Sequence, residues 1–492
     1  MAFFAKLVFM ANETLESIRK IRLEKVKKLR DLKINPYPSR AKGEPIEIQK
    51  ARNLMGQEVE VAGRVMGWRE HGNIIFADLR DESGLIQLWF QKDNLGDNFK
   101  LLKLFDVGDF LYARGKVVKT SAGEISIDVV DFQILSKSIR PLPSKWHGLK
   151  DIEERYRKRY LDLILNEGVR ERFNIRTKLV REIRRYLDSL GYWEVETPTL
   201  QPLYGGANAK PFRTKHNALG CDFYLRIADE LYLKRLIVGG YRRVYEICKD
   251  FRNEGIDQTH SPEFTMIEFY EAYADYHKIM DITEGLFKHL AKSIFGKLEI
   301  KVGEKNINLS GKWPRVLMVD IIKEKLGLDV LSSTKEDLLK FCNENNLEVV
   351  GGETKGQLIF NIFEHKITDM LIEPIWVIDY PKEISPLSKA KWDQPDWVER
   401  FEGYIGGKEI CDGWSELTDP IEQRRRFEED VKAARKDKEE AQQVDEDFLE
   451  AMEYGMPALG GIGIGIDRLT MFFTNTWSIK EVILFPTLRP EK

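Results

Sequence analysis

The sequence predicts an α+β protein with a small β-barrel near the N-terminus and a larger domain that mixes strands and helices. Three observations support this prediction. Residues 58–135 alternate apolar and polar side chains in short runs, residues 244–270 form two strand-like runs around a polar loop, and residues 167–190 carry an apolar stripe at helical spacing. A period of two is typical of strands, and a period near 3.6 is typical of helices.

Composition describes an ordinary globular chain of 492 residues, 42% hydrophobic and 32% charged, with a net charge of −3. We therefore expect about two to four domains and no partner dictated by charge alone. The four cysteines, at positions 221, 248, 342 and 411, form no C-x-x-C pair. Zinc and disulfides are thus disfavoured, and a reducing cytoplasm is favoured. The apolar residues 1–10 are too short to cross a membrane, and Met10 is a second candidate start.

Residues 1–57 predict a lead-in built around a basic amphipathic helix. Apolar side chains, from Leu15 to Leu29, recur among many Lys and Arg, and the prolines of NPYP end the pattern. A packing role and RNA contact are both open for the basic face.

Residues 58–137 predict five short strands, since β-branched and aromatic residues alternate there between the turn formers HGN, ESG and SAGE. Such a pattern is typical of a small closed barrel of the OB type, which binds single-stranded nucleic acid through aromatic side chains on its middle strands. Phe76, Gln87 and Trp89 could share the outward face. Aromatics buried in the barrel are the alternative interpretation.

Residues 138–150 contain two prolines and predict a linker, so the larger domain covers residues 151–492. Within it, residues 167–190 predict a long helix closed by Gly191. YWEVETPTL then predicts a strand with Pro198 near its end, which suits a pairing interface at a sheet edge. A glycine-bearing loop, LYGGANAKPF, precedes a further helix that has Glu230 in its first turn.

Two other segments carry no predicted chemistry. Residues 275–380 alternate weak helical and strand patterns, and we expect them to be peripheral structure of the larger domain. Residues 424–455 predict one long charged helix whose charges form a solvated face.

The hairpin at residues 244–270 is the densest polar constellation. Its strands flank a polar loop of about 8–10 residues that holds His260. Because alternate side chains of a strand share a face, Arg252 lies with Glu254, and Phe264 with Met266, Glu268 and Tyr270. An arginine can hold a phosphate through two parallel hydrogen bonds, and a phenyl ring can stack on a base. The hairpin therefore predicts a nucleoside triphosphate site.

Two further stretches supply glycines and carboxylates. One stretch, GGIGIGIDRLTMFF, predicts a strand whose glycines leave room for a ligand. A helix follows it, with Arg468 near the N-terminus of that helix. In RFEGYIGGKEICDGWSE, Glu402 and Glu409 are a plausible pair of oxygen ligands for Mg²⁺ that bridges phosphates. Asp412, Trp414 and Glu416 share one strand face, so a bulge must intervene if Glu409 faces the same ligand. Solvated surface acids are the alternative for each carboxylate taken singly.

These stretches together resemble the class II lysyl-tRNA synthetases, and the likeness covers nearly the whole chain. The helix and strand that end in Pro198 resemble motif 1, DFRNE…H…EF resembles motif 2, and GIGIGIDR resembles motif 3. The resemblance implies an antiparallel sheet flanked by helices in the larger domain, a barrel that reads the anticodon, and a homodimer formed through the motif 1 helix and strand. It also implies a cytoplasmic enzyme that joins L-lysine to tRNA(Lys), with ATP as co-substrate and Mg²⁺ as cofactor.

The resemblance further implies roles for single residues. The catalytic residues are Arg252, Arg468 and Glu409, and the ATP-binding residues are Arg252, Glu254, His260, Phe264, Glu409 and Arg468. The lysine-binding residues are Gly206, Glu230, Glu254, Glu268, Tyr270, Asp412, Trp414 and Glu416. Glu402 and Glu409 would hold the metal, and Phe76, Gln87 and Trp89 would meet an anticodon uridine.

Electrostatics favours lysine independently of the resemblance. A substrate with two ammonium groups and one carboxylate needs several acids around it, and these stand at positions 230, 254, 268 and 416. Asp412 departs from the family, which usually has asparagine there. A carboxylate at this position would repel the carboxylate of the substrate unless a cation intervenes or Asp412 turns to the α-ammonium.

Two other functions stay open from the sequence. A relative that lysylates a protein would have no use for an anticodon-reading barrel. A catalytically silent RNA-binding paralogue would have no reason to keep Arg252, Glu409 and Arg468. Charging of tRNA with labelled lysine, and lysine-dependent turnover of ATP, distinguish these from a synthetase.

Overall fold

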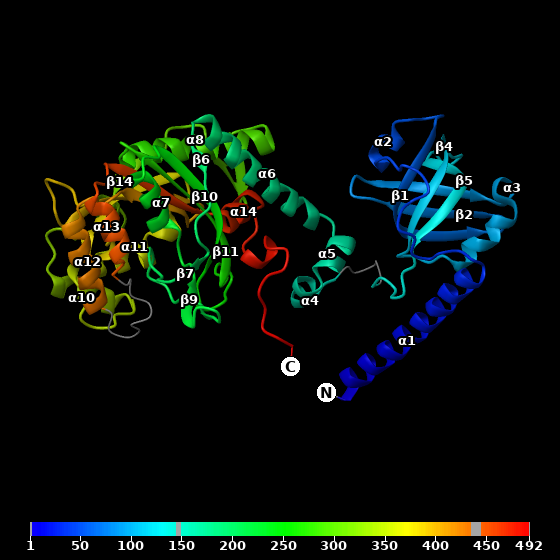
Figure 1. The fold of residues 1–492 in the computed structure, drawn as a ribbon, viewed down its shortest axis with the longest axis horizontal. Coiled ribbons are helices and arrows are strands. Elements are labelled where there is room, and N and C mark those ends of the chain that lie inside the picture. Colours follow the sequence, from blue (N-terminus) through cyan, green and yellow to red (C-terminus); the bar gives the residue numbers. More distant parts are fainter. Residues whose placement is uncertain (1, 144–148, 434–443, 492) are drawn as a thin grey trace. The chain divides into compact units, whose positions relative to one another are not determined.

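The computed structural model describes residues 2–143, 149–433 and 444–491, and its chain forms two compact units, Met1–Lys150 and Asp151–Lys492 (Figure 1). The predicted linker lies partly on residues 144–148, outside the described residues. In the described part of the chain, no helix is both long enough and apolar enough to cross a membrane.

The first unit contains a closed five-stranded barrel in the order β1-β2-β3-β5-β4, as the alternation predicts. Strands β3 and β5 pair in parallel and the other neighbours pair antiparallel. Its elements are α1 (Ala2–Asp31), α2 (Ile48–Arg52), β1 (Glu58–His71), β2 (Ile74–Arg80), β3 (Leu85–Gln91), α3 (Lys92–Leu95), η1 (Gly96–Leu104), β4 (Phe110–Lys119) and β5 (Ile125–Ser136).

The barrel interior is filled by every second side chain of its strands, with Leu79, Leu88 and Ile127 fully buried. Leu29 of α1 belongs to the same hydrophobic cluster, and Lys25 pairs with Asp106 at 2.8 Å. The end of the basic helix therefore packs on the barrel, as the packing alternative required.

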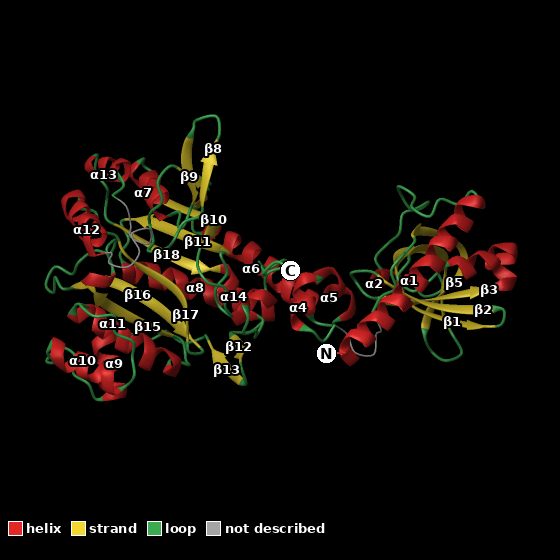
Figure 2. Ribbon diagram, turned by 90° about the horizontal axis from the view of Figure 1, so that it is seen from below, coloured by secondary structure: helices red, strands yellow, loops and turns green. Residues whose placement is uncertain are grey.

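The second unit is built on an eight-stranded sheet in the order β14-β15-β16-β17-β18-β11-β10-β6 (Figure 2). Its inner neighbours are antiparallel, whereas the edge strands β6 and β14 pair in parallel with β10 and β15. The strands are β6 (Trp193–Glu194), β10 (Arg243–Phe251), β11 (Glu263–Ala272), β14 (Arg315–Leu317), β15 (Ile375–Pro381), β16 (Trp397–Ile405), β17 (Lys408–Ser415) and β18 (Leu459–Gly465). The predicted α+β class, with an antiparallel-rich sheet flanked by helices, is confirmed.

One face of this sheet is covered by three helices, α6 (Val169–Ser189), α8 (Tyr276–Phe295) and α14 (Ile466–Phe473). Ile267 and Phe269 of β11 pack in the hydrophobic cluster that these helices complete. Because strand side chains alternate, the residues between and beside them on β11 point to the opposite face. That opposite face carries the cavity-lining residues of β11, among them Glu268 and Tyr270.

The remaining elements surround the sheet. They are α4 (Ile152–Arg157), α5 (Arg159–Leu165), β7 (Leu200–Gln201), β8 (Arg213–His216), β9 (Cys221–Leu225), α7 (Glu230–Val238), β12 (Glu299–Val302), β13 (Lys305–Asn308), α9 (Met318–Leu326), α10 (Lys335–Glu344), α11 (Lys355–Lys366), η2 (Thr368–Met370), η3 (Lys382–Ile384), α12 (Pro420–Ala433), α13 (Glu446–Glu453) and η4 (Ile479–Glu481).

Three predictions about elements need correction. Residues 275–380 are not all peripheral, because α8 lies in the main core and β15 is an inner strand of the sheet. The long charged helix is instead α12 and α13, since the side chain of Asp445 caps a new helix start; residues 434–443 lie outside the described residues. The strand expected in YWEVETPTL is only the two-residue β6, followed by the separate short strand β7.

Candidate active site

A cavity of about 480 Å³ lies on the polar face of the sheet. It is lined by twelve of the fourteen residues that the sequence and the resemblance assigned to catalysis, ATP, lysine or metal. These are Gly206, Glu230, Arg252, Glu254, His260, Phe264, Glu268, Tyr270, Glu409, Asp412, Trp414 and Arg468; Glu402 and Glu416 are not in the lining. Segments that are far apart in the sequence thus share one hollow.

Strand register explains the arrangement as two rows that cross the sheet. In one row, Glu268 of β11 pairs with Gly463 of β18, and Gly463 pairs with Asp412 of β17. In the next row, Tyr270 and Trp414 flank Gly461. Each row therefore has a glycine of β18 at its centre, with a side chain of β11 on one side and a side chain of β17 on the other.

The central glycines open the floor of the cavity. A Cβ added at Gly461 would lie 2.2 Å from a ring carbon of Tyr270 and 2.9 Å from Oε1 of Glu416. A Cβ at Gly463 would lie 3.0 Å from Cε of Met266. The Gly/Ile alternation of β18 therefore keeps its bulky side chains in the core and leaves the other face free for a ligand.

A bulge brings Glu409 to the same hollow. The register between β16 and β17 shifts between Gly403 and Tyr404, where Gly403 pairs with Cys411 and Tyr404 pairs with Glu409. Both Glu409 and Asp412 line the cavity as a result. The sequence analysis required such an irregularity, and the strand pairing contains it.

Arginines, an imidazole and a phenyl ring gather at one end of the cavity. The guanidinium of Arg252 lies 5.2 Å from the ring centre of Phe264, and its buried Nε has no hydrogen-bond partner among the described residues. Arg468 contacts Oε2 of Glu409 and Nε2 of His260, each at 3.4 Å. Free donors beside an aromatic ring suit a phosphate that is attached to a base.

Helix α14 holds Arg468 in place through its neighbour Asp467. Oδ2 of Asp467 accepts a hydrogen bond from the backbone N–H of Thr265 at 2.7 Å, and Oδ1 lies 2.6 Å from Arg176 of α6. These contacts fix the start of α14 against β11, so the side chain of Arg468 projects beside the loop of the hairpin. That loop covers residues 252–262, slightly longer than expected.

Carboxylates gather at the other end of the cavity, around a buried lysine. Nζ of Lys234 contacts both Glu230 and Glu416. Trp414 donates from Nε1 to Glu416 at 2.8 Å, and the hydroxyl of Tyr270 donates to Glu268 at 2.8 Å. Lys234 was missed at the sequence level, although its spacing of four residues from Glu230 on a helix was a usable signal.

Burial makes these acids weak. Burial, reinforced by the nearby charges of Glu230 and Asp250, raises the pKa of Glu268 to about 8. Burial also raises the pKa of Glu416 to about 8, against the opposing effect of Lys234. Such perturbed acids in a cavity are typical of functional sites, because an incoming cation can ionise them.

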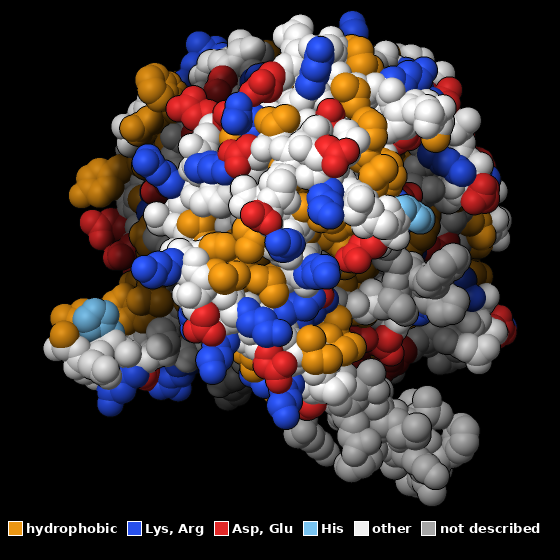
Figure 3. Space-filling model, turned by 90° about the vertical axis from the view of Figure 1, so that its right-hand side faces the viewer, with side chains coloured by type: hydrophobic (Ala, Val, Ile, Leu, Met, Phe, Trp, Pro, Cys, Tyr) orange, Lys and Arg blue, Asp and Glu red, His pale blue; other side chains and the backbone are white. Residues whose placement is uncertain are grey.

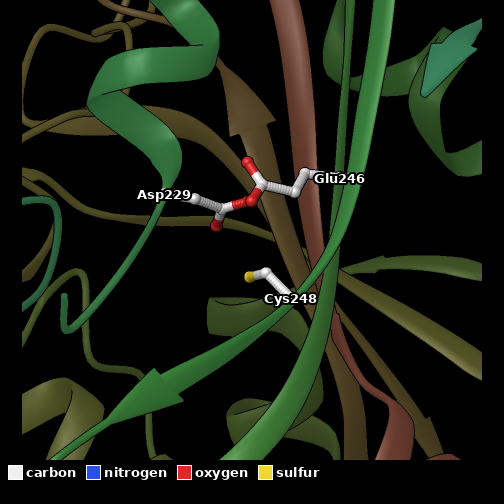
Figure 4. A group of neighbouring side chains, drawn as sticks. All are labelled: Asp229, Glu246 and Cys248. Atoms are coloured by element: carbon white, nitrogen blue, oxygen red, sulfur yellow. The ribbon is translucent and has the colours of Figure 1, made fainter. Parts of the chain in front are cut away.

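A second layer of acids lies behind this end of the cavity and was not predicted. The side chains of Asp229, Glu246 and Cys248 point toward one another (Figure 4), and their ligand atoms lie within 4.8 Å of one another. The ligand atoms of Asp229, Asp250 and Glu268 are equally close. Neither oxygen of Asp229, which is fully buried, has a hydrogen-bond partner among the described residues. Burial and the repulsion of Glu268 raise the pKa of Asp229.

This layer is held by contacts within the protein. Glu246 accepts from Arg226 at 2.7 Å and from the hydroxyl of Thr197 at 2.7 Å. Burial raises the pKa of the Cys248 thiol, so the thiol is protonated near neutral pH. The layer is therefore occupied by its own partners and does not present an open set of metal ligands.

The two acids assigned to magnesium differ in accessibility. The side chain of Glu409 is 40% exposed at the cavity, and among the described residues its polar contact is the 3.4 Å one with Arg468, so it can coordinate a cation. Glu402 is buried, and its oxygens accept from Arg400 at 2.7 Å and from the hydroxyl of Tyr404. The donor set thus fits Mg²⁺ through Glu409, with Glu402 behind it.

In the first unit, the predicted aromatic surface is present on the barrel. Phe76 of β2 pairs with Trp89 of β3, and their rings stack with centres 6.2 Å apart. Both side chains, and that of Gln87, are half-buried and alternate with fully buried neighbours. The Nε1 of Trp89 has no partner within the described residues, and Gln87 accepts from Ser126 at 2.9 Å.

On the face drawn in Figure 3, charge is mixed in sign, because Lys and Arg side chains are interspersed with Asp, Glu and hydrophobic ones. Interaction with nucleic acid is therefore indicated by the stacked aromatics, and net charge adds little to it.

Comparison with protein families gives two matches. Residues 151–489 match the family described as "tRNA synthetases class II (D, K and N)". Residues 59–135 match the family described as "OB-fold nucleic acid binding domain".

Curated relatives extend the similarity over nearly the whole chain. The chain is 47% identical to the "Lysine--tRNA ligase" of Carboxydothermus hydrogenoformans, over 98% of this chain and 100% of the relative. It is 50% identical to the "Lysine--tRNA ligase 2" of Methanosarcina mazei, over 93% and 91%. It is 46% identical to the "Lysine--tRNA ligase" of Bacillus subtilis, over 97% and 98%.

Proposed function

The chain belongs to the class II lysine–tRNA ligases, and on this premise we propose that the cavity of its second unit binds L-lysine and ATP side by side. The observation that carries the proposal is the division of the cavity into two ends. Free guanidinium donors lie beside an aromatic ring at one end, and weak buried acids gather at the other.

At the first end, Arg252 and Arg468 bind the phosphates of ATP while Phe264 stacks on the base. His260 and Glu254 line the same part of the cavity and complete the nucleotide contacts. When bound, Mg²⁺ neutralises phosphate oxygens, and Glu409 with Glu402 behind it would hold the ion.

At the second end, acids bind the two ammonium groups of lysine. Glu230 and Glu254, with the backbone of Gly206, meet the α-ammonium. Glu268, Tyr270 and Glu416 receive the ε-ammonium, with Trp414 beside them. Glu416 does not line the cavity and its Oε2 is held by Lys234 and Trp414, but its Oε1 lies beside the floor of the cavity at Gly461 and has no hydrogen-bond partner among the described residues.

The reaction needs no nucleophile from the protein. A carboxylate oxygen of lysine attacks the α-phosphorus in line, and the bond to the leaving pyrophosphate oxygen breaks. A hydroxyl of the terminal adenosine of tRNA(Lys) then takes the lysyl group and AMP leaves. The chain contributes positioning and neutralisation of charge through Arg252 and Arg468.

The barrel within residues 58–137 supplies the contact with the anticodon. Phe76 and Trp89 would stack on an anticodon uridine, and Gln87 would hydrogen-bond to its edge. We therefore assign tRNA(Lys) as the partner of this unit, residues 1–57 as its lead-in, and residues 151–492 as the catalytic domain.

We further propose a homodimer in the cytoplasm, formed through α6 and β6. Strand β6 forms an edge of the large sheet, and its Trp193 is 67% exposed. Pro198 follows close by and limits further pairing within the chain. Light scattering should give twice the 57.3 kDa of one chain. The four free cysteines suit a reducing compartment.

The test of the site is Arg252→Ala, measured by lysine-dependent exchange of pyrophosphate into ATP. Loss of a preorganised donor to the developing charge should lower the rate by about 100- to 1,000-fold or more. Arg425→Ala is the matched control, because Arg425 of α12 is 48% exposed and outside the cavity lining. Exchange that survives in Arg252→Ala at the level of the control would refute the assignment.

A further inference from the structure

We propose that Arg400 is a positioning residue that neutralises Asp412, so that the two side chains act together as one uncharged unit beside the carboxylate of bound lysine. This inference rests on the function proposed above. It concerns Asp412, the position at which the resemblance implies an asparagine.

The contact between the two residues is bidentate. Nε of Arg400 donates to Oδ1 of Asp412 at 2.9 Å, and Nη2 donates to Oδ2 at 2.8 Å. Parallel bonds of this kind are the strongest arginine–carboxylate geometry, and they fix the plane of both groups. The carboxylate of Asp412 is therefore held in one orientation.

Arg400 has no donor to spare for a substrate. Its Nη2 also donates to Oε1 of Glu402 at 2.7 Å, and its Nη1 donates to Oγ of Ser385 at 2.9 Å. All three of its nitrogens are engaged within the protein. Direct capture of the lysine carboxylate by Arg400 would break one of these bonds, so its role is to hold Asp412.

Packing holds the arginine as firmly as its hydrogen bonds do. Its guanidinium lies 4.9 Å from the ring centre of Tyr380 and 5.9 Å from that of Trp414. Its side chain is 13% exposed. Lysine could not reproduce a planar group between two rings with two parallel bonds, so charge alone would not replace it.

The position of Asp412 makes its charge consequential. Asp412 and Glu268 lie on either side of Gly463 in one row across the sheet, and Asp412 lines the cavity together with Arg400 and Trp414. A bare carboxylate there would repel the carboxylate of lysine. Arg400 cancels that charge, because its guanidinium donates to both oxygens of Asp412.

The test is a double-mutant cycle with Arg400→Gln, Asp412→Asn and the double variant. Arg400→Gln alone leaves two acids unpaired, so the KM for lysine in pyrophosphate exchange should rise by about tenfold or more. The KM for ATP should rise less than the KM for lysine, because Arg400 also holds Glu402 but Glu402 lies outside the cavity lining. Asp412→Asn in the Arg400→Gln background removes the unpaired carboxylate that lines the cavity, so the KM for lysine should return most of the way to the wild-type value.

The matched control is the Arg155–Asp162 pair, which is joined at 2.8 Å and lies outside the cavity lining. Arg155→Gln should leave the KM for lysine unchanged, because this pair does not line the cavity. Thermal melting of every variant separates a folding defect from a binding defect. Asp412→Asn alone removes no cation, so its melting temperature gives a second reference for a correctly folded variant.

The outcomes are distinct. A double variant that is as impaired as Arg400→Gln, or more so, overturns the inference. So does an Arg400→Gln enzyme with an unchanged KM for lysine. If the wild-type chain itself shows no exchange with lysine, the proposed function fails instead, before any variant is compared.

Discussion

At the scale of single residues, the carboxylates of the cavity are tuned by burial and by one another. Glu268 has its pKa raised to about 8, first by burial and then by Glu230 and Asp250. It therefore carries a proton over much of the neutral range when the cavity is free. An ammonium group that enters the cavity favours the ionised form, so binding of lysine should release a proton.

This gives a prediction for pH dependence. Below pH 8, lysine must displace a proton from Glu268, so its affinity should rise by up to about tenfold per pH unit between pH 6 and pH 8. Titration calorimetry in two buffers of different ionisation enthalpy measures both the affinity and the proton released. Glu268→Gln should bind lysine weakly and with a smaller dependence on pH, because Glu416 also has its pKa raised to about 8.

An affinity of the wild-type protein that stays constant from pH 6 to pH 8 would contradict the burial argument. Lysine keeps its own ε-ammonium across this range, because the pKa of a free lysine side chain is about 10.4. The change therefore reports on the protein.

Among single residues, the sequence predicted the acids and arginines of the cavity but not the buried cations beside them. Lys234 lies between Glu230 and Glu416, which are far apart in the chain. Arg400 lies beside Asp412 only because β16 and β17 pair in the observed register. Such partners depend on tertiary pairing, which one segment does not display.

At the scale of elements, strand β18 determines the shape of the site. Its Ile462 and Ile464 pack in the core, while Gly461 and Gly463 face the cavity. The alternation could be predicted from the sequence, and so could the hairpin of β10 and β11. The partner strands of β18 could not, because β11 and β17 come from distant segments.

A pair of glycine variants tests the role of β18. Gly461→Ala should raise the KM for lysine by about tenfold or more, because its Cβ would meet the rigid ring of Tyr270 at 2.2 Å. Gly463→Ala should have the smaller effect, because its Cβ meets the flexible end of Met266 at 3.0 Å. Steady-state pyrophosphate exchange measures both, and the reverse order would show that the floor is not formed by these rows.

Helix α8 shows why part of the fold escaped prediction. Its buried residues, such as Ile279, Leu286 and Phe287, recur at helical spacing, so the helix itself could be predicted but its place in the fold could not. Its place in the core follows from the sheet face that it covers. Residues 424–455 gave the opposite error, because continuous charge hid the helix start that Asp445 caps.

At the scale of the whole molecule, the two units have different proposed roles: the barrel unit binds tRNA and the second unit carries out catalysis. Alternation of side chains sufficed to predict the closed barrel, since each strand lies next to its partner or nearly so. The catalytic unit needed the family resemblance, because its sheet joins strands from residue 193 to residue 465. The division predicts that the two steps of the reaction respond separately to mutation.

Trp89→Ala tests this division. Loss of one stacking platform costs about 1–3 kcal/mol per base, so kcat/KM for charging tRNA(Lys) should fall by about 5- to 150-fold. Pyrophosphate exchange, which needs no tRNA, should be unchanged. Phe110→Ala, on another strand of the barrel, is the control. Loss of exchange in Trp89→Ala would show that the barrel does more than bind RNA.

The most direct test of the central claim is wild-type pyrophosphate exchange with each of the twenty amino acids and with norleucine, which lacks the ε-ammonium. A cavity whose buried acids receive that ammonium should reject norleucine by about 10,000-fold, because its polar groups would stay unpaired. Lysine should be the preferred amino acid by a wide margin. Activation of norleucine at a rate near that of lysine would contradict the account.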